Sequence, residues 1–315
     1  MQDTKSTAII WALKVLPHSL RSKISSAIEP VSDKVQDIVL RCNRPVCVYS
    51  RGKQLYLTQT GCLTDSLKSQ ELVISTQQEV LECFNIACGY SVYSHISEIK
   101  EGFITIKGGH RVGIAGTAVM SSGAIHNIRD ISTISIRISR QIIGCAEAVT
   151  QEYIRARGGL LICGSPCSGK TTLIRDMARL LSTLYAGRVA LVDTRGELAS
   201  VCQGVAQNDV GLCDVLDGYP RAEAIEQAVR SLSPEHIICD EIGSLQDATA
   251  IMRGINSGVR FVATIHAHNK QELIARENIR QILDTGAFKK VVFLSDRDKP
   301  CQITEQLSVE ELCCV

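Results

Sequence analysis

GSPCSGKT, residues 164–171, is the stretch that decides the fold of this chain, because it fits G-x-x-x-x-G-K-[ST] at every fixed position. Its residues are Gly164, Ser165, Pro166, Cys167, Ser168, Gly169, Lys170 and Thr171. The glycines let the backbone turn tightly and bring its N–H groups to phosphate oxygens, and the helix that follows adds its positive end. An apolar run precedes the motif and a helical pattern follows it. A glycine-rich strand–helix turn without a ligand is the alternative.

Side chains of the same motif predict the ligand. Lys170 reaches the β and γ phosphates as a point charge, and the Thr171 hydroxyl is placed to ligate Mg²⁺. We therefore expect ATP and Mg²⁺, with the phosphate site extending from the motif to Thr172.

Two adjacent carboxylates predict hydrolysis as well as binding. The segment from His236 to Glu241 reads HIICDE, an apolar strand that ends in Asp240 and Glu241. Asp240 is predicted to hold the Mg²⁺ shell and Glu241 to act as general base on the attacking water. A strand-end pair that caps the next helix is the alternative.

Polar residues end two further apolar strands. Asp193 and Glu197 follow one of them, and His266 and His268 follow another. Because the carboxyl ends of parallel strands line the ligand crevice, these ends are expected to converge on the phosphate site. Glu197 and His266 are accordingly predicted to be catalytic with Glu241, although a histidine at a strand end is often structural.

The chain is predicted to hold two domains. From residue 37 to 140 short strands alternate with turns, two of them at Gly52 and at Gly108-Gly109, and a capping box from Thr76 to Glu79 starts one helix. This pattern indicates a small α+β domain. From residue 158 apolar strands alternate with helices, one of them expected over residues 270–283, and this is the pattern of a mostly parallel sheet covered on both faces. The boundaries expected are 1–140, with a leading helical segment, 141–157 as a linker, and 158–315 as the P-loop core of an α/β protein.

Composition excludes several classes of protein. Hydrophobic residues make up 45% and charged residues 21% of the 315, so the chain is globular rather than disordered. The net charge of +1 and 4% aromatics argue against an extended nucleic-acid surface. Fourteen scattered cysteines indicate reduced thiols in a cytosolic protein. The apolar stretch from Thr7 to Leu16 is far short of the roughly 20 residues that cross a bilayer.

The order of these motifs resembles that of the type II and type IV secretion ATPases. The resemblance implies a RecA-like hexameric motor in which Asp193/Glu197 form the Asp box and His266/His268 the His box. Longer strings are similar to the stage III sporulation protein AA family: GFITIKGGHRVGIAG at Gly102–Gly116, DVLDG at Asp214–Gly218 and RSLSPE at Arg230–Glu235. That family implies an ATPase in the mother-cell cytoplasm, bound peripherally through integral membrane subunits to a sporulation channel between mother cell and forespore.

Two features of the chain depart from the secretion motors, and the choice of a cationic residue near the phosphate stays open. The tetracysteine motif of many type II secretion ATPases is absent, so no zinc is implied, and Ala267-His268 replaces a Thr-Asn-type continuation, which leaves the sensing imidazole open. A cation near the transferred phosphate is also expected in a ring ATPase. The candidates are Arg111, Arg137, Arg140 and Arg195. Each has the alternative of a solvated surface charge.

Two other functions compete with the motor. RecA-like cores also serve helicases and recombinases, so a nucleic-acid-associated ATPase is the main alternative. A scaffold that binds ATP without turnover is the second, and Glu241 argues against it.

Overall fold

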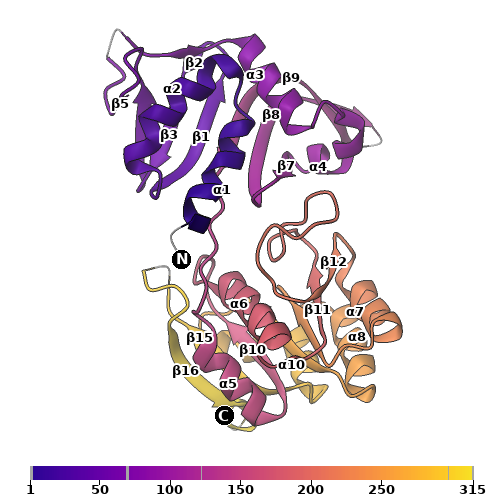
Figure 1. Ribbon diagram of the computed structural model, residues 1–315. Helices are drawn as coiled ribbons and strands as arrows, with labels where there is room; N and C mark the ends of the chain where they lie inside the picture. The colour runs from indigo at the N-terminus through magenta and orange to yellow at the C-terminus, as the bar shows by residue number, and fades with distance from the viewer. Residues whose placement is uncertain (1–2, 69–70, 122, 297, 314–315) are drawn as a thin grey trace. The chain divides into compact units, whose positions relative to one another are not determined.

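The computed structural model describes residues 3–68, 71–121, 123–296 and 298–313 (Figure 1). Contacts divide the chain into two compact units. The first runs to Arg140 and includes Cys202–Gln207, and the second holds Gln141–Val201 and the residues from Asn208 onward. Residues 141–157, expected as a linker, group with the second unit and contain helix α5 (Glu147–Ala156). Within the described ranges, no helix has the length and apolar character that crossing a membrane requires.

An antiparallel sheet of seven strands forms the first unit, in the order β5-β4-β3-β1-β9-β8-β7. Its strands are β1 (Val35–Arg41), β3 (Cys47–Ser50), β4 (Lys53–Leu57), β5 (Leu63–Thr64), β7 (Phe103–Ile106), β8 (His110–Ser121) and β9 (Ala124–Arg137). A separate pair joins β2 (Arg44–Pro45) to β6 (Ile74–Ser75). The predicted turns at Gly52 and at Gly108-Gly109 are confirmed, and all three glycines have positive φ.

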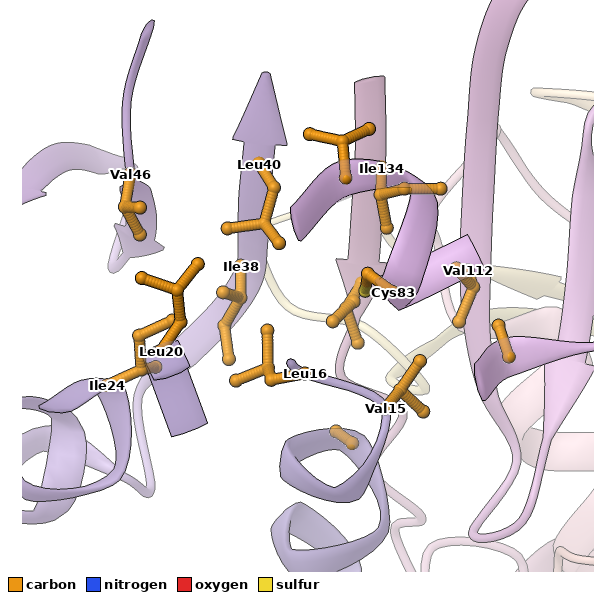
Figure 2. Packing of buried hydrophobic residues seen from close by; sticks show 14 of the residues in the cluster. Val15, Leu16, Leu20, Ile24, Ile38, Leu40, Val46, Cys83, Val112 and Ile134 are labelled. Carbon is orange, nitrogen blue, oxygen red and sulfur yellow. The ribbon is translucent and has the colours of Figure 1, made fainter. Parts of the chain in front are cut away.

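Helices complete this unit around one apolar core. They are α1 (Asp3–Lys14), α2 (His18–Ile28), α3 (Gln77–Ala87) and α4 (Ile96–Lys100), with short 3₁₀ segments η1 (Glu29–Val31) and η2 (Val92–His95). Leu16 and Ile24 meet Ile38 and Leu40 of β1 in the core (Figure 2). The predicted capping box of α3 is confirmed, because Thr76 and Glu79 exchange side-chain and backbone hydrogen bonds.

The second unit is built on the predicted parallel sheet. Its order is β12-β11-β13-β14-β10-β15-β16, and every pair is parallel except the edge pair of β15 with β16. The strands are β10 (Gly159–Cys163), β11 (Val189–Asp193), β12 (Asp214–Asp217), β13 (His236–Cys239), β14 (Arg260–Ile265), β15 (Phe288–Leu294) and β16 (Ile303–Ser308). The central strands β10, β11 and β13 are buried along their whole length, which is why they read as continuous apolar runs.

Seven helices of the described chain belong to this unit. They are α5, α6 (Lys170–Thr183), α7 (Arg221–Ser231), α8 (Leu245–Asn256), α9 (Lys270–Ala275), α10 (Glu277–Asp284) and α11 (Val309–Cys313). The single helix expected over residues 270–283 is wrong, because Arg276 adopts an extended conformation (φ −89°, ψ 114°) that separates α9 from α10. Strands β12 and β16 lie at the edges of the sheet, where partial exposure weakens the apolar pattern that identifies a strand.

A buried histidine begins β13. His236 is 2% exposed, and its Nδ1 lies 2.9 Å from the Tyr153 hydroxyl while its Nε2 lies 3.2 Å from Nη2 of Arg260. Because a guanidinium only donates, Nε2 accepts and the proton of the neutral ring belongs on Nδ1. Burial, together with the Arg260 charge, lowers the pKa of His236 to about 4.

This lowered pKa predicts acid sensitivity. The unfolded chain takes up a proton near pH 6.5 and the folded chain only near pH 4, so stability falls as the pH drops between these values. Urea unfolding at about pH 5 is expected to give a free energy of unfolding about 2 kcal/mol below that at about pH 8 from this group alone. His236→Gln removes the titration. An equal loss of stability in the variant and the wild type would contradict the assignment.

Candidate active site

The phosphate motif forms the loop between β10 and α6. The Gly164 N–H donates to the Ile265 carbonyl (3.3 Å), and Gly169 has a φ of +94°. A Cβ on Gly164 would lie 2.5 Å from the Ser168 hydroxyl, and one on Gly169 would lie 2.6 Å from the Cys301 sulfur. Both positions therefore require glycine, for space at the first and for space and conformation at the second.

One polar atom of this loop lacks a partner. Oγ of Ser168 is fully buried, and no residue in the described ranges offers it a hydrogen bond. A buried hydroxyl in that state costs about 1–3 kcal/mol. A loop at a helix N-terminus with a spare donor fits an anion, so the residues present fit the phosphates that the motif predicts.

Lys170 is buried in the loop and linked to a candidate base. Its Nζ donates to the carbonyls of Gly164 and Ser165 (2.8 Å each) and lies 3.1 Å from Nδ1 of His266. Burial lowers the pKa of Lys170, while the nearby Asp240 and Glu241 charges raise it. With Nδ1 accepting from the ammonium, His266 is neutral with its proton on Nε2, and Nε2 donates to Oε1 of Glu241 (2.7 Å).

The predicted magnesium ligands are paired. Oγ1 of Thr171 donates to Oδ2 of Asp240 (2.8 Å), and both side chains are half-buried. A hydroxyl and a carboxylate at contact distance, beside a phosphate loop, supply the hard oxygen donors that Mg²⁺ takes from proteins. The donor set fits the predicted cation.

Glu241 has an unusual backbone conformation and two side-chain contacts. Its φ of +53° lies in the left-handed region, which a non-glycine residue adopts at a functional site or under strain. Oε2 lies 2.6 Å from Nη1 of Arg195, whose side chain is 65% exposed, and Oε1 accepts from His266. A cavity of about 370 Å³ opens beside this carboxylate; its lining includes Ile242, Gly243 and residues 276–279. The cavity gives water a route to Glu241.

The acidic segment after β11 has a structural carboxylate at its start. Asp193 is 2% exposed, and its oxygens accept from the N–H groups of Glu197, Leu198 and Ala199 (2.8–3.0 Å). Arg175 of α6 donates to the carbonyls of Glu197 and Leu198. Asp193 and Arg175 thus fix the backbone of this loop, and the half-buried Glu197 is carried on it.

The two imidazoles separate in space. His266 lies between Lys170 and Glu241, whereas Nδ1 of the exposed His268 lies 2.9 Å from Oγ of Ser165. Ser165 also donates to Oδ1 of Asp296 (2.6 Å). Sequence reasoning missed Asp296, although it lies two residues after the end of β15 and the strand-end rule that found the other polar residues applies to it.

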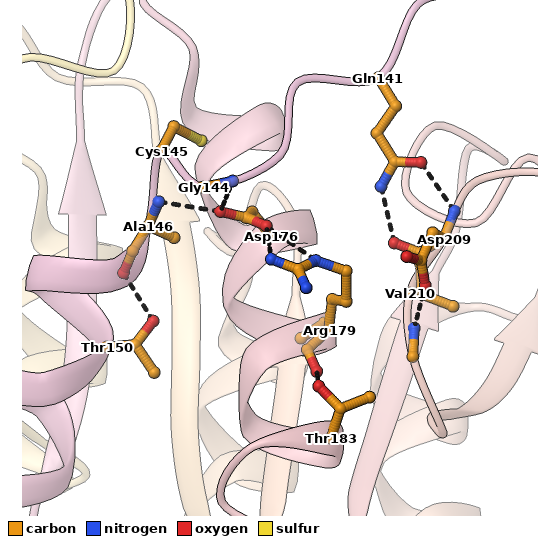
Figure 3. A network of polar contacts seen from close by, with 12 residues as sticks. Gln141, Gly144, Cys145, Ala146, Thr150, Asp176, Arg179, Thr183, Asp209 and Val210 are labelled. Carbon is orange, nitrogen blue, oxygen red and sulfur yellow. Dashed lines mark hydrogen bonds and ion pairs between the residues drawn. The ribbon is translucent and has the colours of Figure 1, made fainter. Parts of the chain in front are cut away.

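Helix α6 is fixed to the segment that leads into α5 (Figure 3). The fully buried Asp176 accepts from the N–H groups of Gly144 and Ala146 (2.9 Å each) and from the Arg179 guanidinium. Gln141 exchanges two hydrogen bonds with the backbone of Asp209. The chain that enters this unit is therefore tied to the helix that carries the phosphate loop.

The three candidate arginines of the first unit have partners inside that unit. Arg137 pairs with Asp37 (3.2 Å), Arg140 donates to the Ser32 carbonyl (2.9 Å), and Arg111 lies over the Phe103 ring. Arg195 is the candidate that lies in the site, where it contacts Glu241.

Comparison with known proteins identifies the family. The family model described as "Sporulation stage III, protein AA" matches residues 8–308. The chain belongs to this family. It is 34% identical over 299 residues to stage III sporulation protein AA of Bacillus subtilis (strain 168), and the match spans 93% of this chain and 92% of the relative. The resemblance predicted from the long sequence strings is confirmed.

Solved structures show the same fold. The ATPase DotB of Yersinia pseudotuberculosis is 16% identical with a TM-score of 0.58, over 93% of this chain and 80% of the other. The pilus retraction motor PilT with bound ADP is 16% identical with a TM-score of 0.55, over 86% and 76% of the two chains. The predicted α/β class, with a P-loop core and an additional N-terminal domain, is confirmed.

Proposed function

We propose that the protein hydrolyses ATP to ADP and phosphate with Mg²⁺. The observation that carries this proposal is the connected set at the carboxyl ends of three adjacent strands. Lys170 follows β10, Glu241 follows β13, and His266 follows β14 and bonds to both of them. The likeness in fold to PilT, a motor with bound ADP, agrees with nucleotide binding by this fold.

Phosphate binding falls to the loop and the first turn of α6. The donors are the Ser168 hydroxyl and the N–H groups of residues 165 and 167–172, since Pro166 has none, and the N-terminus of a 14-residue helix adds its partial positive charge. Lys170 leaves its two carbonyl partners for the β and γ phosphates. The proposed phosphate site therefore runs from Gly164 through Thr172.

Thr171 and Asp240 are the residues proposed to hold Mg²⁺. A bound Mg²⁺ neutralises the charge that develops on the β and γ phosphates. The hydroxyl already lies against the carboxylate, so the two oxygens need little rearrangement to share a cation.

Glu241 is proposed as the general base. The carboxylate takes a proton from the attacking water, and the neutral His266 fixes its orientation from the side of Lys170. Arg195 holds the other carboxylate oxygen and is exposed enough to leave it. We assign Glu197 a supporting catalytic role, because its loop follows β11, the strand next to β13, and is fixed rigidly at the same sheet edge.

Family membership supports the biological role. We propose that hydrolysis drives assembly or transport by a sporulation channel complex between mother cell and forespore, on its mother-cell side. The same proposal includes a hexameric ring and peripheral attachment through integral membrane subunits. We also propose a division into an N-terminal domain at 1–140, a linker at 141–157 and the P-loop core at 158–315.

Phosphate release by the purified full chain tests the proposal. We expect ATP turnover that EDTA abolishes and Mg²⁺ restores, with no stimulation by single-stranded DNA or RNA. Stimulation by nucleic acid of about tenfold, weakening steeply with salt, would instead support the nucleic-acid-associated ATPase. An absence of turnover at every magnesium concentration would contradict hydrolysis.

A further inference from the structure

We infer that Thr264 is a positioning residue that sets the geometry of Asp240 and Glu241 together. The inference rests on the proposed ATP hydrolysis and deepens it, because it names the side chain that holds the magnesium ligand and the base in register.

Thr264 lies at the carboxyl end of β14 and is fully buried. Strand β14 pairs with β13 such that Ala263 lies opposite Cys239, and the next step along both strands brings Thr264 beside Asp240. The Thr264 hydroxyl donates to Oδ1 of Asp240 and accepts the N–H of Glu241 (2.8 Å). One hydroxyl is therefore bonded to both acidic residues at once.

The same residue also fixes the turn after β13 through its backbone. The Ile242 N–H donates to the Thr264 carbonyl (3.0 Å). The N–H of Glu241 and the N–H of the residue after it therefore both donate to Thr264. Glu241 is held between them with a φ of +53°. A left-handed non-glycine residue persists only where its surroundings over-determine it, and these two hydrogen bonds supply that restraint.

Asp240 is bound from both sides in consequence. Oδ1 faces Thr264 and Oδ2 faces Thr171, so the carboxylate plane has one orientation. Without the Thr264 hydroxyl the carboxylate gains freedom to rotate and the Glu241 backbone loses a partner. Lys170 takes part in neither hydrogen bond of the Thr264 hydroxyl and bonds to the carbonyls of the loop. Loss of that hydroxyl therefore leaves phosphate binding by the loop in place.

Threonine suits this position for a reason that a variant pair can separate. The hydroxyl donates and accepts at the same time, which valine cannot do at nearly the same volume. Serine keeps the hydroxyl and loses only a buried methyl group. A purely structural role predicts that both substitutions act through stability, whereas a positioning role predicts that only valine alters turnover.

The test compares Thr264→Val and Thr264→Ser in the full chain, with Thr249→Val, an exposed threonine of α8, as a matched control. Thr264→Val is expected to lower kcat about 10–100-fold and to raise the Mg²⁺ concentration for half-maximal activity about tenfold. The Kd of Thr264→Val for ATP without metal is expected to stay within about threefold of wild type. The kcat of Thr264→Ser and its Mg²⁺ concentration for half-maximal activity are expected to stay within the same range. Thermal unfolding of each variant separates loss of folding from loss of positioning.

Several outcomes would overturn the inference. The inference is wrong if Thr264→Val has a kcat and a magnesium dependence within about twofold of wild type. It is also wrong if Thr264→Ser loses as much activity as Thr264→Val. Failure of the proposed function is distinguishable, because a wild-type chain without turnover still reports magnesium-assisted ATP binding. In that case an equal Mg²⁺ effect on ATP affinity in wild type and Thr264→Val overturns the inference, and a smaller effect in the variant supports it.

Discussion

Lys170→Ala is expected to weaken ATP binding by about 100-fold or more, because each hydrogen bond from a charged donor to phosphate contributes about 1.5–3 kcal/mol and Lys170 supplies more than one. The ammonium is buried beside the carbonyls of Gly164 and Ser165, which holds it at the phosphate loop. Equilibrium titration with a fluorescent ATP analogue measures the loss. ATP turnover is expected to fall with it.

The truncation also removes a donor from two loop carbonyls. That change costs folding stability in addition to affinity, so thermal unfolding is measured beside binding. Lys170→Met keeps the aliphatic stem and removes only the charge, and Lys53→Ala, an exposed lysine of β4, controls for charge removal. A folded Lys170→Met variant that bound ATP within about threefold of wild type would contradict the phosphate site.

Local sequence rules predicted the parts of the site that depend on neighbouring residues in the chain. The phosphate loop between β10 and α6 follows from glycine spacing and a flanking apolar strand, and both glycines occupy positions that exclude a Cβ. The capping box at Thr76 is likewise a local pattern. In each case the residues that decide the conformation lie within a few positions of one another.

No single segment of the sequence determines the order of the strands in the sheet. Strands β10 and β14 are neighbours although about a hundred residues separate them, and this pairing brings His266 to Lys170. The sequence predicted His266 to be catalytic but left open which of His266 and His268 senses phosphate, and their different tertiary contacts distinguish the two rings. The break at Arg276 was missed because an exposed, helix-favouring arginine gives no local signal for an extended backbone.

Glu241→Gln is expected to keep ATP affinity within about threefold of wild type and to lower turnover by about 100-fold or more, the range that general-base catalysis contributes. Glutamine preserves the side-chain volume and can still accept from Nε2 of His266. It has no basic oxygen for the proton of the attacking water. Single-turnover hydrolysis with quenched samples measures the chemical step directly, and light scattering measures whether the ATP-bound variant accumulates as a stable oligomer.

Substitutions can distinguish a structural role of Glu241 from a catalytic role. A carboxylate that serves only to pair with Arg195 (2.6 Å) would lose stability on substitution, without a selective effect on hydrolysis. Glu241→Asp keeps the charge and withdraws it by one methylene, so a catalytic role predicts a loss of turnover here too, since a general base acts only within hydrogen-bond reach of the water. Glu305→Gln, an exposed carboxylate of β16, is the control. Normal turnover in Glu241→Gln would move the base elsewhere, and Glu197, on the loop after the neighbouring strand, would then be the carboxylate to substitute next.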